Sequence, residues 1–302
     1  MTDTEDQLHL LKKHCSIILE SGNALIDIEF ERLKYRSSEY VRVPTSEGSK
    51  EVNRKKNRYK DILPFDHSRV VLPKERFVDG SDYINANIIT DEKSKVCYIA
   101  SQGPLPSTVD DFWRMIWHYN VTLIIMVCKE VEKGKPRCQR YWPYSEEVIQ
   151  QKHMKISLAG EKKYTQSLKM RQIKVTKGNK ERLVTQLHYM DWPDHGAPET
   201  TEAAMQLIEI LHETYPKHDQ PILVHCSAGC GRTGAIIAID RITKLIQDRA
   251  KQINVYDVVL DLRRQRPAMV QTKEQYEFVY KVVQQMVESE IERHDADGVS
   301  HK

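Results

Sequence analysis

The spacing of hydrophobic positions changes several times along the chain. Residues 7–35 follow helical spacing, whereas residues 36–60 are polar and basic and are expected to form a loop. Residues 153–190 alternate between polar and apolar positions, which predicts a β-meander. The remaining expected strands are 97–102, 121–127 and 221–226, and the remaining expected helices are 110–119, 201–215, 231–247, 254–266 and 272–294.

Strands in the middle of the chain, with helices around and after them, predict an α/β (α+β) fold in which helices cover a mixed sheet. No Pro-, Gly- or Ser-rich linker divides the sequence, so we expect a single domain over residues 1–294. Residues 295–302 are polar and are expected to form a frayed tail.

Composition narrows the possible partners. The chain has 302 residues, 40% of them hydrophobic, and its 46 basic and 43 acidic residues leave a net charge of +3. This balance excludes a strong global attraction to nucleic acid or to a membrane surface. The longest apolar run, 121–128, is too short to span a bilayer, and the acidic, polar start MTDTEDQLHL is unlike a signal peptide. We therefore expect no nucleic-acid partner and no membrane insertion.

The six cysteines are scattered and form no CxxC pair. This spacing argues against a disulfide scaffold and against a zinc site. Thiols that persist unpaired indicate a reducing compartment, so we expect a cytoplasmic protein without a metal.

A short loop between the strand 221–226 and the helix 231–247 has the composition of an anion site. Small residues in such a loop let successive backbone N–H groups converge, and the following helix N-terminus points its dipole at the same place. The candidate binding residues are Ser227, Ala228, Gly229, Cys230 and Gly231.

Cys226 begins this loop and Arg232 ends it. The N–H groups and the helix dipole favour the thiolate over the thiol, so we expect Cys226 to ionise readily. Arg232 lies six positions later and can present a planar fork to two phosphate oxygens. A Walker loop is excluded because GxxxxGK[ST] is absent. The alternative, a buried structural cysteine beside a glycine-rich turn, leaves the combination of cysteine, small residues and arginine unexplained.

The segment HCSAGCGRTG, residues 225–234, resembles the signature loop of the non-receptor protein tyrosine phosphatases. The resemblance covers roughly residues 5–290, because further motifs follow in the family's order. The sequence CSAGCGRTG, together with QRPAMVQTKEQYEFVY, is similar to that of the PEST-type subgroup. It implies a highly twisted mixed sheet flanked by helices, no cofactor, and phosphotyrosine-containing proteins as partners in signalling.

The resemblance implies roles for residues outside the loop. Asp194 in Trp192-Pro-Asp-His-Gly would be the general acid for the leaving tyrosine oxygen and then the base for water. Gln271 would position that water, and Gln275 would assist. Thr272 and Gln275 also fit the N-cap and the capping-box partner of a helix, and both readings can hold together.

The pocket walls are implied in the same way. In Lys55-Lys-Asn-Arg-Tyr-Lys-Asp61, Tyr59 would stack on the substrate ring and Asp61 would accept hydrogen bonds from the substrate backbone. Residues 82–87, DYINAN, are interpreted as structural support. Glu132 would pair with Arg232 and hold its fork, while Arg137 stands where relatives commonly carry a lysine.

Two residues beside the nucleophile complete the implied site. His225 would orient the loop and tune the thiolate rather than act as a base, and Thr233 would donate its hydroxyl to the sulfur of Cys226. The implied reaction is attack by Cys226 on phosphorus, followed by hydrolysis of the phosphocysteine. A monomer is the default expectation.

Two other cysteines are candidates for redox chemistry, since a readily ionised thiolate is also readily oxidised. Cys128 or Cys230 is expected to capture oxidised Cys226 as a reversible disulfide. The competing interpretation is that both are small buried core residues.

Two rival functions remain open at this stage. One is a dual-specificity or phosphoinositide phosphatase with the same loop, against which the segment KNRYKD and the chain length argue. The other is a catalytically dead phosphotyrosine-binding module, against which the joint presence of Cys226, Arg232, Asp194 and Gln271 argues.

Overall fold

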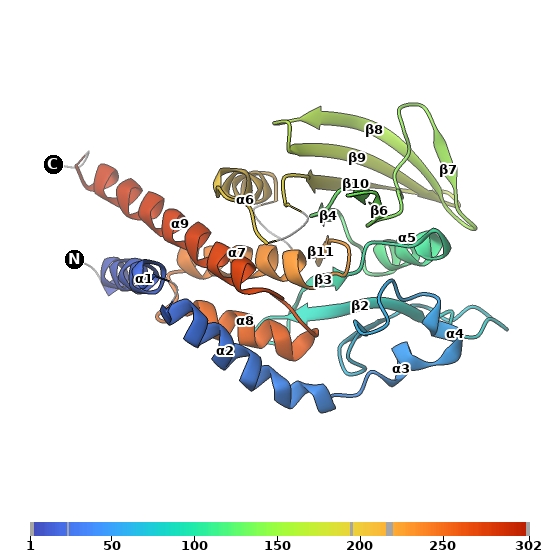
Figure 1. Ribbon diagram of the computed structural model, residues 1–302. Helices are drawn as coiled ribbons and strands as arrows, with labels where there is room; N and C mark the ends of the chain where they lie inside the picture. Colours follow the sequence, from blue (N-terminus) through green and yellow to red (C-terminus); the bar gives the residue numbers. More distant parts are fainter. Residues whose placement is uncertain (1–2, 23, 194–195, 216–219, 300–302) are drawn as a thin grey trace.

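A mixed β-sheet runs through the middle of the molecule (Figure 1). The computed structural model describes residues 3–22, 24–193, 196–215 and 220–299. Within these residues nine strands form one sheet, in the order β1-β2-β3-β11-β4-β10-β9-β8-β7. The strands are β1 (Arg69–Val71), β2 (Tyr83–Thr90), β3 (Val96–Ser101), β4 (Leu123–Met126), β7 (Val148–Gln150), β8 (Lys155–Lys163), β9 (Leu168–Lys177), β10 (Lys180–Tyr189) and β11 (Ile222–His225).

The centre of the sheet is parallel and its flanks are antiparallel. β11 pairs in parallel with β3 on one side and β4 on the other, and β4 pairs in parallel with β10. Every residue of β4 and of β11 is buried, as expected for central strands covered on both faces. The predicted meander corresponds to β8, β9 and β10, which pair antiparallel. The predicted mixed sheet is confirmed.

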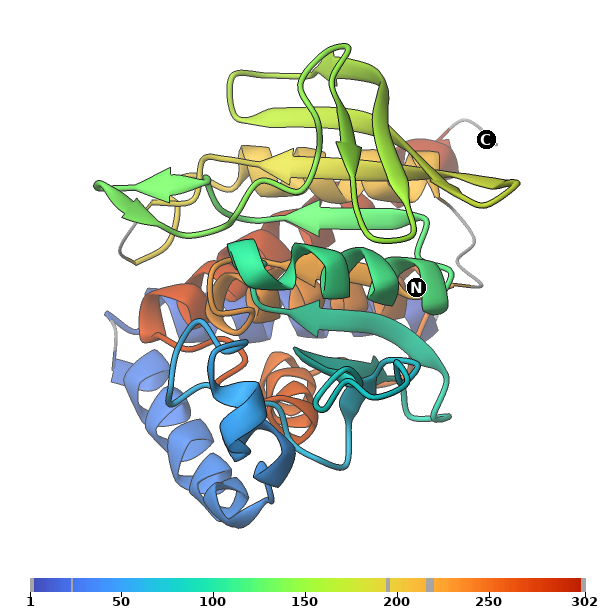
Figure 2. The same cartoon turned by 90° about the vertical axis from the view of Figure 1, so that its right-hand side faces the viewer.

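Helices cover both faces of this sheet (Figure 2). The amphipathic α5 (Val109–His118) lies on one face and buries Phe112, Trp113 and Met115. On the other face α7 (Gly231–Gln247) contacts β3 and β11 and is backed by α8 and α9. The remaining helices of this layer are α6 (Glu202–Thr214), α8 (Val255–Gln265) and α9 (Lys273–Val299).

The predicted helical segment 7–35 forms two helices, α1 (Asp3–Glu20) and α2 (Ala24–Ser38), which pack against α9. Figure 1 shows α1 and α9 side by side at one end of the molecule. α9 continues to Val299, so the helix expected over 272–294 is longer than predicted and includes residues of the expected tail.

The expectation of a loop over residues 36–60 was wrong in part. The segment contains η1 (Glu39–Arg42), α3 (Ser46–Ser49) and α4 (Glu51–Arg54). The carboxylate of Asp66 accepts hydrogen bonds from the backbone N–H groups of Ser46 and Glu47 at 2.8 and 3.0 Å. Asp66 thus caps α3 from 20 residues further along the chain, a partner that local sequence patterns do not reveal.

The parallel strands β3, β11, β4 and β10 all end at the same edge of the sheet. The chain therefore leaves this edge at Gln102, Cys226, Val127 and Met190, and β2 enters the sheet there from the segment that follows α4. Near this edge lie the small hairpin of β5 (Val131–Glu132) and β6 (Lys135–Pro136), and η2 (Pro106–Thr108). Segments far apart in the sequence are thus brought together.

Candidate active site

The loop after β11 folds as a turn around the sulfur of Cys226. Cys226 is 4% exposed, and its Sγ accepts a hydrogen bond from the N–H of Gly229 at 3.2 Å. Gly229 has φ +74°, and a Cβ there would overlap the carbonyl of Ser101 in β3. Only glycine fits this position, because both the left-handed backbone and the neighbouring strand exclude a side chain. The helix α7 then begins at Gly231, beside the cysteine.

Arg232 leaves the first turn of α7 and pairs with the buried carboxylate of Glu132 on β5. Its NH1 and NH2 groups donate to the two oxygens of Glu132 at 2.6 and 3.0 Å. NH2 also donates to the carbonyl of Pro193 at 3.1 Å, in the segment expected to carry the general acid. Burial opposes the charge of Arg232, but the hydrogen bond to Glu132 outweighs it and raises the pKa of Arg232. The guanidinium is therefore a fixed positive charge beside Cys226.

A cavity of about 340 Å³ opens above the sulfur. It brings together most of the predicted site residues: Tyr59, Asp61, Glu132, Cys226, Ser227, Ala228, Gly231, Arg232, Gln271 and Gln275. Arg137 and Gly196 line it as well. A larger cavity of about 480 Å³ lies elsewhere, beside Arg140 and Tyr144, but it contains no cysteine and none of the predicted site residues.

Tyr59 forms one wall of this cavity. Its hydroxyl lies 2.9 Å from Ser227 Oγ, and Arg137 NH1 donates to it at 3.2 Å. Ser227 in turn donates to the carbonyl of Arg137 at 3.1 Å. Three loops, each from a different part of the chain, are thus joined at the pocket wall.

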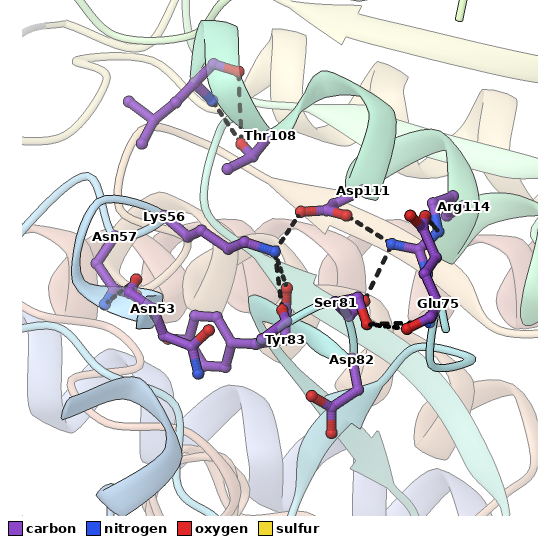
Figure 3. A network of polar contacts seen from close by, with 12 residues as sticks. Asn53, Lys56, Asn57, Glu75, Ser81, Asp82, Tyr83, Thr108, Asp111 and Arg114 are labelled. Atoms are coloured by element: carbon purple, nitrogen blue, oxygen red, sulfur yellow. Dashed lines mark hydrogen bonds and ion pairs between the residues drawn. The ribbon is translucent and has the colours of Figure 1, made fainter. Parts of the chain in front are cut away.

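Lys56, three residues before Tyr59, takes part in a network of charged and polar contacts (Figure 3). Lys56 Nζ donates to Asp111 Oδ2 of α5 at 2.8 Å, and to the carbonyls of Gly80 and Tyr83. Arg114, one turn further along α5, pairs with Asp111 at 2.7 Å. Lys56, which belongs to the basic run 55–61, therefore has a structural role and is not a solvated surface lysine.

Arg266 is a site residue that sequence reasoning missed, although it lies in the quoted QRP segment. It is fully buried, and its Nε and NH2 donate to the carbonyls of Gly229 and Ala228 at 2.7 and 3.0 Å. NH1 and NH2 also donate to Asn87 and Asn85 at 2.7 and 2.9 Å. Arg266 binds the carbonyl oxygens of these loop peptide groups, so the N–H groups of the same peptides point away from Arg266. Asn85 and Asn87 of the DYINAN segment hold Arg266 and thereby provide the structural support expected of them.

His225 is completely buried below the loop. Burial lowers the pKa of His225 to about 4, so the ring is neutral at neutral pH. Gln186 donates to the hydroxyl of Tyr141 at 2.7 Å, which leaves the tyrosine proton for His225 Nε2 at 2.8 Å. Nδ1 then carries the proton and donates to the carbonyl of Cys226 at 3.3 Å. The ring orients the loop backbone.

The predicted capping box at the start of α9 is present. Gln275 N donates to Thr272 Oγ1 at 3.3 Å, and Gln275 Oε1 accepts from the N–H groups of Thr272 and Gln271. Gln271 itself is exposed to the cavity. The cap therefore fixes the backbone of Gln271 next to the loop.

One expected contact is missing and one expected residue lies outside the described part of the chain. Thr233 is fully buried, and among the described residues its hydroxyl has no hydrogen-bond partner. The predicted hydrogen bond from Thr233 to Cys226 was therefore wrong, and the sulfur accepts a hydrogen bond from the N–H of Gly229. Asp194 lies outside the described residues, and its neighbour Trp192 is held by a hydrogen bond to the carbonyl of Gly196 at 3.1 Å.

The two candidate redox partners are both buried thiols. A hydrogen bond with Cys138, together with burial, raises the pKa of Cys128. Burial raises the pKa of Cys230 to about 11. All six cysteines are free, and a disulfide with Cys226 stays a prediction.

The protein-tyrosine phosphatase family model matches residues 53–285. The chain belongs to this family. Human tyrosine-protein phosphatase non-receptor type 12 is 44% identical over 276 residues, which cover 89% of this chain and 35% of that protein. Human non-receptor type 18 is 43% identical over 244 residues, which cover 80% of this chain and 53% of that protein. The resemblance to the PEST-type non-receptor subgroup is confirmed, although the chain spans only about a third to a half of these relatives.

Solved structures support the same assignment. The catalytic domain of human non-receptor type 18 superposes with a TM-score of 0.85 at 40% identity, covering 90% of this chain and 99% of that one. The same phosphatase in complex with a HER2 phosphopeptide gives a TM-score of 0.86 at 38% identity, covering 92% and 99%. The predicted phosphatase fold is confirmed.

No helix among the described residues combines the length and the apolar character needed to cross a membrane. In the same part of the chain, no group of three or more His, Cys, Asp or Glu side chains is arranged to hold a metal ion.

Proposed function

We propose that this domain hydrolyses phosphotyrosine in proteins through a covalent phosphocysteine. The observation that carries the proposal is the position of Cys226 at the floor of a cavity beside Arg232, whose fork is fixed by Glu132. A family relative binds a HER2 phosphopeptide, which supports phosphotyrosine proteins as the substrate class.

In the first step the thiolate of Cys226 attacks phosphorus in line, and the bond to the tyrosine oxygen breaks. The loop N–H groups and Arg232 stabilise the charge on the three equatorial oxygens. Asp194 protonates the leaving oxygen. In the second step, water placed by Gln271 attacks phosphorus, Asp194 takes the proton, and the thiolate leaves.

The depth of the pocket provides selectivity. Tyr59 forms the wall on which the substrate ring stacks, and its hydroxyl is held by Ser227 and Arg137. The shorter side chain of phosphoserine leaves its phosphate far from Cys226. We also propose that the domain acts as a cytoplasmic monomer in signalling, and that oxidised Cys226 is protected by Cys128 or Cys230.

The test compares a phosphotyrosine peptide with its phosphoserine counterpart, in EDTA, for the wild type and Cys226→Ser. We expect turnover of phosphotyrosine alone, which Cys226→Ser reduces by about four orders of magnitude. Cys97→Ser, a half-buried cysteine on β3 away from the cavity, is the matched control and retains full activity.

Other outcomes separate the rival functions. Turnover of both peptides contradicts the depth argument and indicates a dual-specificity enzyme. Tight phosphotyrosine binding without turnover indicates a phosphotyrosine reader. Asp194→Ala is expected to slow peptide hydrolysis, with the largest effect on poor leaving groups, because it removes the acid.

A further inference from the structure

The segment between α8 and α9 is held by a second buried arginine besides Arg266. Arg263, in the last turns of α8, is 6% exposed. Its Nε donates to the carbonyl of Met269 at 2.9 Å, and its NH2 donates to the carbonyl of Val270 at 2.6 Å. Val270 is the residue directly before Gln271. One guanidinium therefore binds the carbonyl groups of the two residues that precede the water-positioning glutamine, Gln271.

The gripped segment is strained. Ala268 has φ +57° and Val270 has φ +55°, both in the left-handed region. For a β-branched residue such as Val270 this conformation is unfavourable and persists only where the surroundings impose it. Without its two carbonyl anchors, the segment is expected to relax toward ordinary backbone angles and to carry Gln271 with it.

The same segment is packed against the loop that holds Cys226. The N–H of Val270 donates to the carbonyl of Cys230 at 3.4 Å. Gly234 in α7 approaches so closely that a Cβ there would overlap the backbone N of Val270. The backbone before Gln271 therefore packs directly against the loop of residues 226–231, and this packing depends on its present conformation.

The placement of Arg263 is not explained by an ion pair. Arg263 forms no salt bridge with a described residue, and burial lowers the pKa of Arg263 to about 10. An arginine buried without a counter-charge is costly to fold around. Its third nitrogen, NH1, donates to Ser37 Oγ of α2 at 3.2 Å, and the guanidinium lies 5.4 Å from the centre of the Phe30 ring. α2 thus closes the cage that holds the arginine.

We propose that Arg263, supported by Ser37, is a positioning residue for the second chemical step. It holds the backbone of Met269 and Val270 in the conformation that places Gln271 against the phosphocysteine. This inference rests on the proposed function, and it adds a link from helix α2 to the hydrolysis of the intermediate.

The two steps of the reaction use different groups, which makes the role measurable. In the second step an oxygen–phosphorus bond forms to water, the phosphorus–sulfur bond breaks, the thiolate leaves, and the proton passes to the carboxylate of Asp194. Gln271 takes part in this step, whereas formation of the intermediate depends on Cys226 and Arg232. A defect in Arg263 is therefore expected to slow hydrolysis of the intermediate and to leave its formation unchanged.

The test is Arg263→Lys, assayed with an aryl phosphate in the steady state and by rapid mixing. Lysine keeps the charge but cannot bind both carbonyls through a planar fork. We expect kcat and KM to fall together by about tenfold, with kcat/KM unchanged, because kcat/KM reports only the steps up to phenol release. Rapid mixing should then show a burst of phenol that approaches one equivalent per enzyme.

The matched control is Arg182→Lys. Arg182 on β10 is a half-buried arginine that likewise donates to a backbone carbonyl, that of Trp117, at 2.6 Å, and it stacks on the Trp117 ring. Neither of these contacts involves the segment 266–271. We expect this variant to show wild-type kcat and no burst, even if its melting temperature falls.

A milder pair of variants tests the support from α2. Ser37→Ala removes the partner of Arg263 NH1 and leaves both carbonyl bonds in place, so we expect about a twofold fall in kcat at constant kcat/KM. Ser38→Ala is the adjacent control, because Ser38 donates only to the carbonyl of Tyr35 at 2.7 Å and lies on the exposed side of α2. Its kinetics should match those of the wild type.

The results that overturn the proposal are distinct from failure of the proposed function. If Arg263→Lys lowers kcat/KM as much as kcat, or shows no burst, then Arg263 supports the fold and not the second step. If Arg263→Lys does not fold, as judged by circular dichroism, equal kinetics for the two serine variants reject the role. A wild type without phosphotyrosine turnover rejects the proposed function itself.

Discussion

Helix α7 carries two clusters of buried charged side chains, one at its first turn and one in its middle, and the two have different surroundings. At the first turn, Arg232 and Glu132 form an ion pair at the edge of a cavity, next to the thiol of Cys226. Eight residues after Arg232 on the same helix, Asp240 is 1% exposed and binds Tyr98 from β3 and His212 from α6. Lys244, one turn on, also pairs with Asp240 at 2.9 Å.

The two clusters differ in whether their side chains are accessible from a cavity. Both carboxylate oxygens of Asp240 are bound by protein side chains, and these contacts connect β3, α6 and α7 in the interior. Arg232 and Cys226 instead line an open cavity of about 340 Å³. A buried charge alone therefore does not mark a catalytic site. Access to a cavity is what distinguishes the proposed active site from the Asp240 cluster.

The largest expected effect breaks the first cluster. Arg232→Lys keeps a positive charge but removes the planar fork, so the equatorial oxygens lose a preorganised pair of donors. We expect kcat/KM for a phosphotyrosine peptide to fall by about 10²–10³ while the melting temperature changes little. Lys244→Arg, at the second cluster, is the control and should leave kcat/KM within about twofold. A loss below about tenfold in Arg232→Lys would argue against its assigned role.

The second effect tests whether Glu132 acts through Arg232. Glu132→Gln keeps the shape of the side chain but removes the charge that fixes the guanidinium at 2.6 and 3.0 Å. A fork that is free to move is expected to lower kcat/KM by about tenfold or more. In the double variant with Arg232→Lys, the two losses should combine to less than their product, because both act on one group. Full multiplicativity would contradict the coupling.

The third effect is on stability and leaves activity unchanged. Asp240→Asn removes the charge that His212 and Lys244 face, so we expect a loss of about 3 kcal/mol in the free energy of unfolding. Urea denaturation measures this loss, and kcat/KM should stay within about twofold of the wild type. A large fall in kcat/KM in a folded variant would show that the cluster reaches the active site after all.

The smallest effect is the acid sensitivity of the second cluster. The hydrogen bond from His212 and the charge of Lys244 outweigh burial and lower the pKa of Asp240 to about 2, from an ordinary 3.8. A lowered carboxyl pKa contributes stability that is present above the ordinary value and is lost as the pH falls toward 2. We expect about 2 kcal/mol of the unfolding free energy to disappear over this window through Asp240. In Asp240→Asn the acid loss should be smaller by that amount.

Most elements were predictable because their hydrophobic spacing is local and regular. α5, α7 and α8 lie within one or two residues of the expected helices, and the capping box of Thr272 and Gln275 was read from spacing alone. The short helix α3 was not predictable, since its cap is Asp66, 20 residues away. The hydroxyl of Thr233 was also misplaced: it is buried, and among the described residues it has no hydrogen-bond partner.

The sequence by itself predicted which groups carry the proposed chemistry. A cysteine, a run of small residues and an arginine between a buried strand and a helix specify an anion site, because that local order fixes where the N–H groups and the helix dipole point. The family motifs also indicated the acid, the water-positioning glutamine and the carboxylate partner of Arg232.

Only the tertiary structure decided how those groups are held. Arg266 and Arg263 bind carbonyls of the phosphate loop and of the segment before Gln271, and Ser37 of α2 completes the second of these contacts. Nothing in the spacing of these residues predicts such contacts. They depend on parallel strands ending at one edge and on helices from both ends of the chain meeting behind it, and long-range packing of this kind is not encoded in any local pattern.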